Sequence, residues 1–182
     1  MRNWMQRGAR LLRHRWAEGR MRSALPDELL DRLGRRVAAS ELRHSGEIRI
    51  CVEAGLPLSY IWRDASARER AVALFGKLRV WDTEHNNGVL IYLLLADHSI
   101  EIIADRGLTR AIPADTWDQL AQQMGTAFHD GQYEDGLTHA LAHVTGLLHA
   151  HFATAADMPA SADENSLPDA PVRLGRGQRT QA

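Results

Sequence analysis

Oxygen-bearing side chains gather in one short segment of the sequence, residues 80–88. Two carboxylates and two amides fall within it: Asp82, Glu84, Asn86 and Asn87. Carboxylate and amide oxygens held on loops are the ligands that Ca²⁺ and Mg²⁺ prefer. The same residue types also favour turns through hydrogen bonds to their own backbone, and Asn-Gly forms turns readily. The segment alone therefore leaves a divalent-cation site and an ordinary polar turn both open.

The two elements that follow this segment are expected to bring a further carboxylate close to it. Residues 89–95 form an apolar run typical of a central strand buried on both faces. The loop over residues 96–99 is so short that it returns the chain antiparallel, which predicts a second strand over residues 100–104. Asp105 follows that strand and is therefore expected beside the polar turn.

An earlier strand is predicted over residues 47–53, where apolar and charged residues alternate. Its mostly charged second face indicates an outer or partly covered strand. A helix with a capping-box pattern leads from it to the apolar run, so the two strands are expected to be parallel in a right-handed βαβ unit. Glu47 then lies at the same edge of the sheet as Gly88, whereas Glu53 lies at the far end and is excluded.

The rest of the chain is predicted to be largely helical. One helix begins near Pro26, stops at Gly46 and buries an apolar stripe: Leu29, Leu30, Leu33, Val37 and Leu42. The helix after Ser66 continues through Val72, Phe75 and Leu78. A further helix runs from Pro113 to Gly131 with Asp115 in its first turn, and the last buries Leu137, Ala140, Leu141, Val144, Leu147 and Leu148.

These elements predict an α/β fold, a compact sandwich in which helices flank a small mixed sheet made of the βαβ unit and the antiparallel hairpin. The folded domain is expected over residues 25–152, after a basic segment over residues 1–24. Residues 153–182 are rich in Ala, Pro, Asp and Ser without periodicity, which predicts a flexible tail.

The familiar catalytic and metal-binding signatures are absent from the sequence. It has no phosphate loop, His-Glu-x-x-His, Gly-x-Ser-x-Gly or Cys-x-x-Cys motif. His139 and His143 are four residues apart and could share an ion, but at about 100° per residue they project away from the buried stripe. An exposed histidine pair is therefore expected there. The single cysteine, Cys51, excludes an intrachain disulfide and fits a reducing compartment.

The N-terminal segment is strongly basic. Residues 1–22 carry one acid and seven arginines: Arg2, Arg7, Arg10, Arg13, Arg15, Arg20 and Arg22. Trp4, Leu11, Leu12 and Trp16 fall close to helical spacing, so an amphipathic helix with a basic face is expected. Peripheral contact with an anionic membrane surface, a solvated basic arm and a helix packed on the domain all stay open.

Charge and hydropathy limit the partners and the compartment. The net charge of −1 speaks against a nucleic-acid partner. No apolar run approaches the roughly 20 residues needed to span a bilayer, and no signal-peptide core precedes Ala24. A cytoplasmic protein is expected, with attachment to the inner face of the membrane as an open alternative. The apolar residues 58–62 in a predicted loop either fold over the domain or offer a contact surface for a protein partner.

Several motifs together resemble the TPM domain family, described as TPM-type phosphatases and related to a photosystem II repair factor of plant thylakoids. They are His44-Ser-Gly-Glu-Ile-Arg49, Arg68-Glu-Arg-Ala71 with Phe75, Trp81-Asp-Thr-Glu-His-Asn-Asn-Gly-Val-Leu-Ile-Tyr92 and Ile100-Glu-Ile-Ile-Ala-Asp-Arg-Gly107, followed by Trp117, Met124, Phe128, Gly131, Tyr133, Gly136 and His151-Phe152. The resemblance covers about residues 40–152. It is greatest to the short bacterial form without a signal peptide or membrane anchor.

The resemblance implies an α/β sandwich that holds a divalent cation, Ca²⁺ or Mg²⁺, at loops beside the sheet. Carried over by motif, the ligand positions are Glu47, Asn87 and Asp105, with Asp82 and Asp115 behind them. Some members are credited with acid phosphatase activity, which implies a metal-dependent phosphomonoester hydrolase. The alternative is a cation-stabilised scaffold that binds a protein partner or a membrane surface. Ala104 and Ala153 depart from the glycine and proline common in relatives, and neither departure removes a ligand.

Overall fold

The computed structural model describes residues 4–153 and 167–175. In chain order the elements are α1 Trp4–Ala24, α2 Asp27–Glu41, β1 Ile48–Glu53, α3 Leu58–Trp62, α4 Ala67–Lys77, β2 Val89–Leu94, the 3₁₀ turn η1 Leu95–Asp97, β3 Ser99–Ala104, α5 Arg106–Ala111, α6 Ala114–His129, α7 Tyr133–Phe152 and β4 Val172–Leu174. This confirms the predicted α/β class.

The four strands form one mixed sheet in the order β3-β2-β1-β4. β1 runs parallel to β2, with Ile48 opposite Val89. β2 runs antiparallel to β3, with Val89 opposite Ala104. The predicted βαβ unit and hairpin are therefore both confirmed, and every residue of β2 is buried as a central strand requires.

β1 is also central, so the prediction of an outer or partly covered strand is wrong. All six of its residues are buried, including those of the charged face. The physical reason is that these charges find partners. Glu53 binds Arg70 of α4, and Arg49 Nη1 donates to the carbonyl of Ala170 at 3.1 Å.

β4 corrects the prediction that the chain lacks regular structure after Ala153. Residues 172–174 pair in parallel with β1. Arg173 anchors them to the start of α2, because its Nη2 donates to the Leu25 carbonyl at 2.6 Å and its Nη1 pairs with Asp27 at 2.5 Å. Residues 154–166 and 176–182 of the predicted tail lie outside the described residues.

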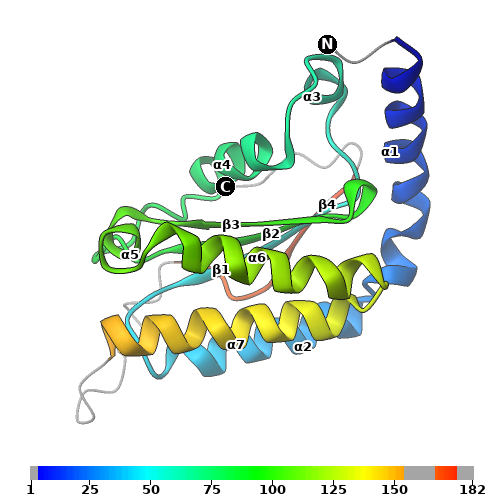
Figure 1. Ribbon diagram of the computed structural model, residues 1–182. Coiled ribbons are helices and arrows are strands. Elements are labelled where there is room, and N and C mark those ends of the chain that lie inside the picture. The colour runs from blue at the N-terminus through cyan, green and yellow to red at the C-terminus, as the bar shows by residue number, and fades with distance from the viewer. Residues whose placement is uncertain (1–3, 154–166, 176–182) are drawn as a thin grey trace.

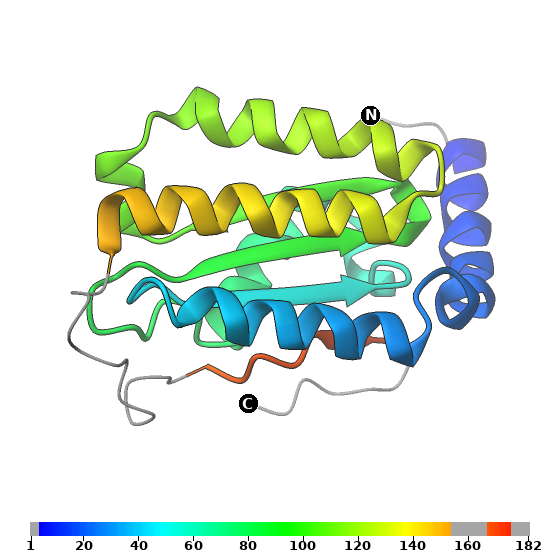
Figure 2. The same cartoon turned by 90° about the horizontal axis from the view of Figure 1, so that it is seen from below.

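Helices cover both faces of the sheet (Figure 1). α2, α7 and α6 lie side by side across one face, as the view from below shows (Figure 2). α4 covers the other face. Alternate residues of β1 therefore enter two cores: Ile48, Ile50 and Val52 face the three-helix layer, and Cys51 faces α4.

Local details differ from the predictions in four places. α2 ends at Glu41 instead of Gly46 and leaves Leu42 exposed, since the chain must turn there to enter β1. Val72 is exposed on α4, where Ala71 and Leu74 are buried instead. Residues 58–62 form the short helix α3, and α5 follows β3 directly.

α1 stands across the end of the sheet where β1 and β2 finish (Figures 1 and 2). It contacts η1 and α3, so a helix packed on the domain is the alternative that the structure shows. Within the described part of the chain, no helix is long and apolar enough to cross a membrane.

Gly88 is a position where the fold requires the absence of a side chain. A Cβ atom built there would lie 1.9 Å from the carbonyl oxygen of Val80, so Gly88→Ala forces the two backbones apart. We expect a loss of at least about 3 kcal/mol in the free energy of unfolding, measured by urea denaturation. Gly125→Ala is the control, because a Cβ in the interior of α6 meets nothing within 4 Å and should stabilise by about 0.5–1 kcal/mol. Equal effects of the two substitutions would contradict the close approach.

Candidate cation site

The sheet register brings three of the predicted positions to one edge. The Val89 N–H donates to the Glu47 carbonyl at 2.9 Å, and the Asp105 N–H donates to the Gly88 carbonyl at 2.9 Å. Glu47, Gly88 and Asp105 therefore follow one another across β1, β2 and β3. Glu53 lies at the opposite end, beside Leu94, as its exclusion required.

The carbonyl of Val80 stands on this edge between the two carboxylate-bearing strands. Side chains alternate along a strand, so Glu47 and Asp105 share the sheet face on which Cys51 lies. Gly88 separates them, and the Val80 oxygen occupies the space above its Cα atom. Sequence reasoning missed this oxygen because a backbone atom carries no residue-type signal; the glycine opposite it was the available sign.

Asn87 is fully buried at the same edge, and its amide is held in a fixed orientation. Its side-chain Nδ2 donates to Ser45 Oγ at 3.2 Å, while its backbone N–H donates to Thr83 Oγ1 at 3.0 Å. Among the described residues its Oδ1 accepts no hydrogen bond, although it is buried. An unused buried acceptor costs free energy unless a donor or a cation meets it.

Asp105 presents a second oxygen of this kind. Its Oδ1 accepts from the Arg106 N–H at 2.7 Å and caps α5, whereas its buried Oδ2 accepts nothing from the described residues. Asn86 fixes the adjoining turn, since its carbonyl accepts from the Gly107 N–H at 2.8 Å and its Oδ1 accepts from Arg106 Nε at 2.7 Å.

The remaining predicted ligands lie at the surface. Asp82 and Asp115 are both exposed, and Asp115 occupies the first turn of α6, where a carboxylate complements the helix dipole. The structure thus places Glu47, Asn87 and Asp105 at one end of the sheet, while Asp82 and Asp115 are exposed. In the described ranges no three or more His, Cys, Asp or Glu side chains form a metal-holding group.

The donor set that is present fits a hard cation. It combines carboxylate, amide and carbonyl oxygens, and Ca²⁺ or Mg²⁺ accepts such mixed ligands together with water. His44 is buried with Nδ1 donating to the Gly46 carbonyl at 2.9 Å, and burial lowers its pKa to about 4. His139 and His143 are exposed, as predicted.

A carboxyl pair flanks the site on the side of β4. Glu41 Oε1 accepts from the Ile48 N–H at 2.8 Å, and its carboxyl group also shares a hydrogen bond with Asp169. Burial, this bond and the neighbouring charges of Asp169 and Glu47 raise the pKa of Glu41 to about 8. Glu41 is therefore protonated at neutral pH and links α2 to the segment before β4.

A second polar cluster at the opposite edge was not predicted. Arg70 binds Glu53 through Nε and Nη2 at 2.8 and 2.7 Å, and the Tyr92 hydroxyl donates to the same carboxylate at 2.7 Å. Burial alone would lower the pKa of Arg70, but the hydrogen bonds and charge of Glu53 outweigh it and raise that pKa. Burial and Glu53 together raise the pKa of Tyr92. The available sign was Arg70, a charged residue between the apolar positions of α4.

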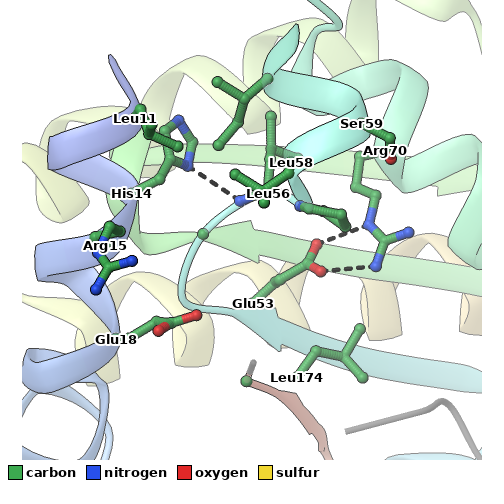
Figure 3. Close-up of a pocket in the computed structure, with 14 residues that line it drawn as sticks. Leu11, His14, Arg15, Glu18, Glu53, Leu56, Leu58, Ser59, Arg70 and Leu174 are labelled. Carbon is green, nitrogen blue, oxygen red and sulfur yellow. Dashed lines mark hydrogen bonds and ion pairs between the residues drawn. The ribbon is translucent and has the colours of Figure 1, made fainter. Parts of the chain in front are cut away.

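This cluster borders a cavity of about 470 Å³ between α1, α3 and the ends of β1 and β4 (Figure 3). Leu11, Leu56 and Leu174 supply apolar walls, and Arg15 and Glu18 of α1 lie across from the ion pair. The buried charges of Glu53 and Arg70 already satisfy each other.

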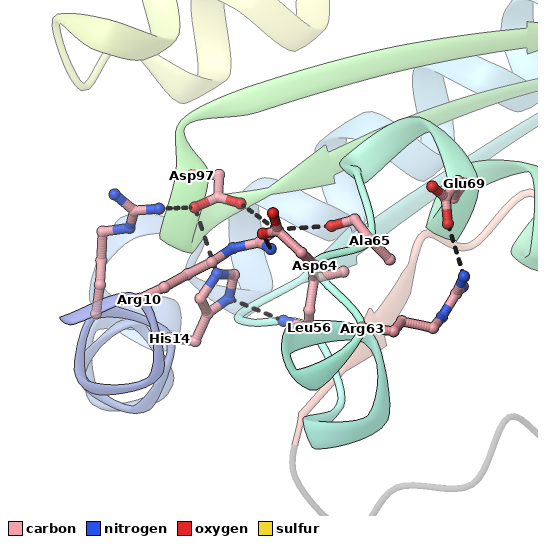
Figure 4. A network of polar contacts seen from close by, with 9 residues as sticks. Arg10, His14, Leu56, Arg63, Asp64, Ala65, Glu69 and Asp97 are labelled. Carbon is pink, nitrogen blue, oxygen red and sulfur yellow. Dashed lines mark hydrogen bonds and ion pairs between the residues drawn. The ribbon is translucent and has the colours of Figure 1, made fainter. Parts of the chain in front are cut away.

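A third network fastens α1 to the domain (Figure 4). His14 Nδ1 accepts from the Leu56 N–H at 3.0 Å, which leaves the proton on Nε2, 3.3 Å from Asp97. Arg10 binds Asp64 at 3.0 Å and the Ala65 carbonyl at 2.8 Å. Burial opposes ionisation of Asp97, but the hydrogen bond from His14 and the charges of Arg13 and Arg10 outweigh it and hold its pKa well below the usual range.

The sequence of this chain matches a known protein family. The sequence profile described as the TPM domain matches residues 20–147, well over half of the chain. The chain belongs to the TPM domain family. None of the curated proteins compared with it matches in sequence.

Two solved structures share the fold of this TPM domain. The NMR structure of the BA42 protein from the psychrophilic bacterium Bizionia argentinensis has a TM-score of 0.67 and 24% identity, over 82% of this chain and 95% of that one. The N-terminal domain of a P. gingivalis protein has a TM-score of 0.52 and 21% identity, over 64% and 71%. At these identities the likeness shows the fold alone.

The raised pKa of Glu41 predicts how the stability of the TPM domain depends on pH. Because the folded-state pKa, about 8, exceeds the ordinary value of 4.5, the wild-type protein loses stability as pH rises between these values. Glu41→Gln stays neutral and avoids the loss. We expect it to exceed the wild type by up to roughly 4 kcal/mol in the free energy of unfolding at pH 9, with the advantage vanishing towards pH 4.

Urea unfolding across this pH range measures the effect, and Glu28→Gln serves as the control. Glu28 is exposed in the first turn of the same helix, so its replacement should leave the shape of the pH profile unchanged. Parallel profiles for the wild type and Glu41→Gln would show that Glu41 is ionised in the folded state.

The Glu53–Arg70 pair predicts a large cost for removing one charge. Glu53→Gln leaves the Arg70 guanidinium buried without a counter-charge, and we expect a loss of about 3–5 kcal/mol. Glu69→Gln removes the partner of Arg63 in an exposed pair and should cost less than about 1 kcal/mol. Thermal unfolding of both variants makes the comparison, and similar melting temperatures would refute the structural role of the buried pair.

Proposed function

We propose that this TPM domain binds a divalent cation, Ca²⁺ or Mg²⁺, through Glu47, Asn87 and Asp105, and that the bound cation stabilises the domain as a scaffold. The observation that carries the proposal is the pair of buried oxygens, Asn87 Oδ1 and Asp105 Oδ2, that accept no hydrogen bond within the described chain. The carbonyl oxygen of Val80 is a further ligand atom for the cation at the same edge of the sheet. Asp82 and Asp115 are included only as exposed carboxylates outside this group of three ligands.

The corner is already rigid, which favours binding. Ser45 and Thr83 hold Asn87, and the α5 cap holds Asp105. Little conformational entropy is therefore lost when a cation binds, because the coordinating side chains are already held in place. A cation that binds only the folded state stabilises it by about 2.7 kcal/mol at one hundred times its dissociation constant.

On the basis of the sequence motifs, we also propose a closer relationship within the TPM domain family. The chain is then similar in role to the short bacterial members and, more distantly, to the photosystem II repair factor. A cytoplasmic location and a protein partner for the scaffold follow from the same proposal. Leu58 and Trp62 of α3 are exposed and supply an apolar contact for such a partner.

The test is a melting-temperature titration of the metal-free protein with Ca²⁺ and with Mg²⁺. Saturating cation should raise the melting temperature by roughly 5–10 °C. Asp105→Asn should abolish most of the shift, because a carboxylate oxygen becomes an amide. Asp31→Asn makes the same change of charge at an exposed position on α2 and should keep the shift. A wild-type protein that responds to neither ion, or a shift lost equally in both variants, removes the site.

A metal-dependent phosphomonoester hydrolase is the second candidate. The observation in its favour is Arg106, an exposed guanidinium directly beside Asp105, where it could bind a phosphoryl oxygen. A bound cation would supply Lewis-acid polarisation of the phosphoryl group. Turnover of p-nitrophenyl phosphate that requires metal and falls in Arg106→Gln, with Arg110→Gln unaffected, would favour the enzyme; a melting shift without turnover would favour the scaffold.

A further inference from the structure

The outward face of α1 is apolar along its middle and basic on both flanks. Leu12 and Trp16 lie one turn apart and are 60% and 72% exposed. At about 100° per residue, two arginines fall on each side of this apolar ridge. All four are exposed: Arg13 and Arg20 on one flank, and Arg15 and Arg22 on the other.

The opposite face of α1 is fixed to the domain, so the ridge is held outward. Arg10, His14 and Met21 are buried against the domain, and the first two are bonded to residues of the β1–α3 and α3–α4 connections. Figures 1 and 2 both show α1 at the margin of the molecule, with no described element beyond its outer side. A flat surface can therefore approach the whole length of the helix.

A groove of about 730 Å³ runs beside the ridge. Leu12, Trp16 and Ala17 line it from α1, Leu95 and Tyr133 line it from the domain, and Arg13 and Arg20 supply its charge. An apolar groove flanked by guanidinium groups suits a molecule with an apolar chain and an anionic head.

Positive charge is concentrated on this helix. α1 carries six arginines and one glutamate, while the whole chain has a net charge of −1. Tryptophan and arginine on one exposed helical face favour the interface of an anionic bilayer, where the ring enters the headgroup region and the guanidinium groups meet phosphates. A nucleic acid would use the arginines but would leave the Leu12–Trp16 ridge and the apolar groove without a role.

We infer that α1 docks this TPM domain on an anionic phospholipid surface, with Leu12 and Trp16 inserted between headgroups and Arg15, Arg20 and Arg22 bound to lipid phosphates, while Arg13 keeps its ion pair with Asp97. The inference uses only α1 and the groove beside it. It stands independently of the cation site at the other edge of the sheet.

Co-sedimentation with lipid vesicles tests the inference, with EDTA present so that the cation site plays no part. The full chain should bind vesicles of phosphatidylcholine with about one third phosphatidylglycerol and should not bind phosphatidylcholine alone. Added salt should weaken the binding, because it screens exposed charges.

Two variants should weaken binding without unfolding the protein. Trp16→Ala should reduce the partition coefficient at least about tenfold through lost apolar burial. The triple variant R15Q/R20Q/R22Q should reduce it by about one hundredfold, since each arginine near the surface contributes roughly fivefold. Melting temperatures should stay within a few degrees of the wild type, because all four side chains are exposed.

Matched controls change the same residue types elsewhere. Trp81→Ala removes a half-exposed tryptophan from the opposite edge of the sheet. The triple variant R35Q/K77Q/R110Q removes three positive charges from exposed positions on α2, α4 and α5. Both should bind anionic vesicles like the wild type.

Three results would overturn the inference. One is the absence of binding to anionic vesicles at low salt, and another is equal loss of binding in the α1 and control variants. The third is a wild-type dimer in light scattering that Trp16→Ala converts to a monomer while vesicle binding stays unchanged, which would assign the ridge to a second copy of the chain.

Discussion

The buried pair of Glu53 and Arg70 is the interaction on which the arrangement of the sheet depends. A carboxylate on a central strand is costly unless charged donors meet it, and here the two residues are only 4% and 6% exposed. Two hydrogen bonds from Arg70 and one from Tyr92 satisfy the carboxylate. β1 can then lie between β2 and β4 with its charged face covered by α4. Because β1 pairs with β2, Glu47 at its start lies beside Gly88.

The candidate cation site owes its geometry to close backbone approaches. Gly88 admits the Val80 carbonyl, and Gly107 admits the carbonyls of His85 and Asn86, since a Cβ there would lie 2.8 and 2.5 Å from them. Asn86 adopts a φ of 52°, a left-handed conformation that asparagine tolerates better than most residues. The residues of ligand-like type at this corner therefore have two different roles. Asn86 and the glycines shape the corner, while Asn87 and Asp105 present oxygens to it.

Much of this arrangement could be predicted from residue order alone. The apolar run of β2, the short loop to β3 and the capping box at Ser66 each have a local cause, so their prediction needed no knowledge of the rest of the fold. Strand direction then brought Glu47 and Asp105 to one edge. The central place of β1 could not be predicted because it depends on Arg70, a partner on another element. The three residues of β4 are too few for any period to be visible, and the Val80 carbonyl is a backbone atom common to every residue.

The pairing of β4 with β1 has a consequence for the order in which the chain can complete its sheet. Cys51 lies opposite Val172, which emerges from the ribosome 121 residues later. At about 5–20 residues per second, the outer side of β1 waits several seconds or more for its partner. During that interval an apolar strand presents unpaired N–H and C=O groups, the condition under which strands of neighbouring chains join. Arg173, which ties the late strand to Leu25 and Asp27, thus fastens the strand that covers the exposed side of β1, whereas the other three strands can assemble much earlier.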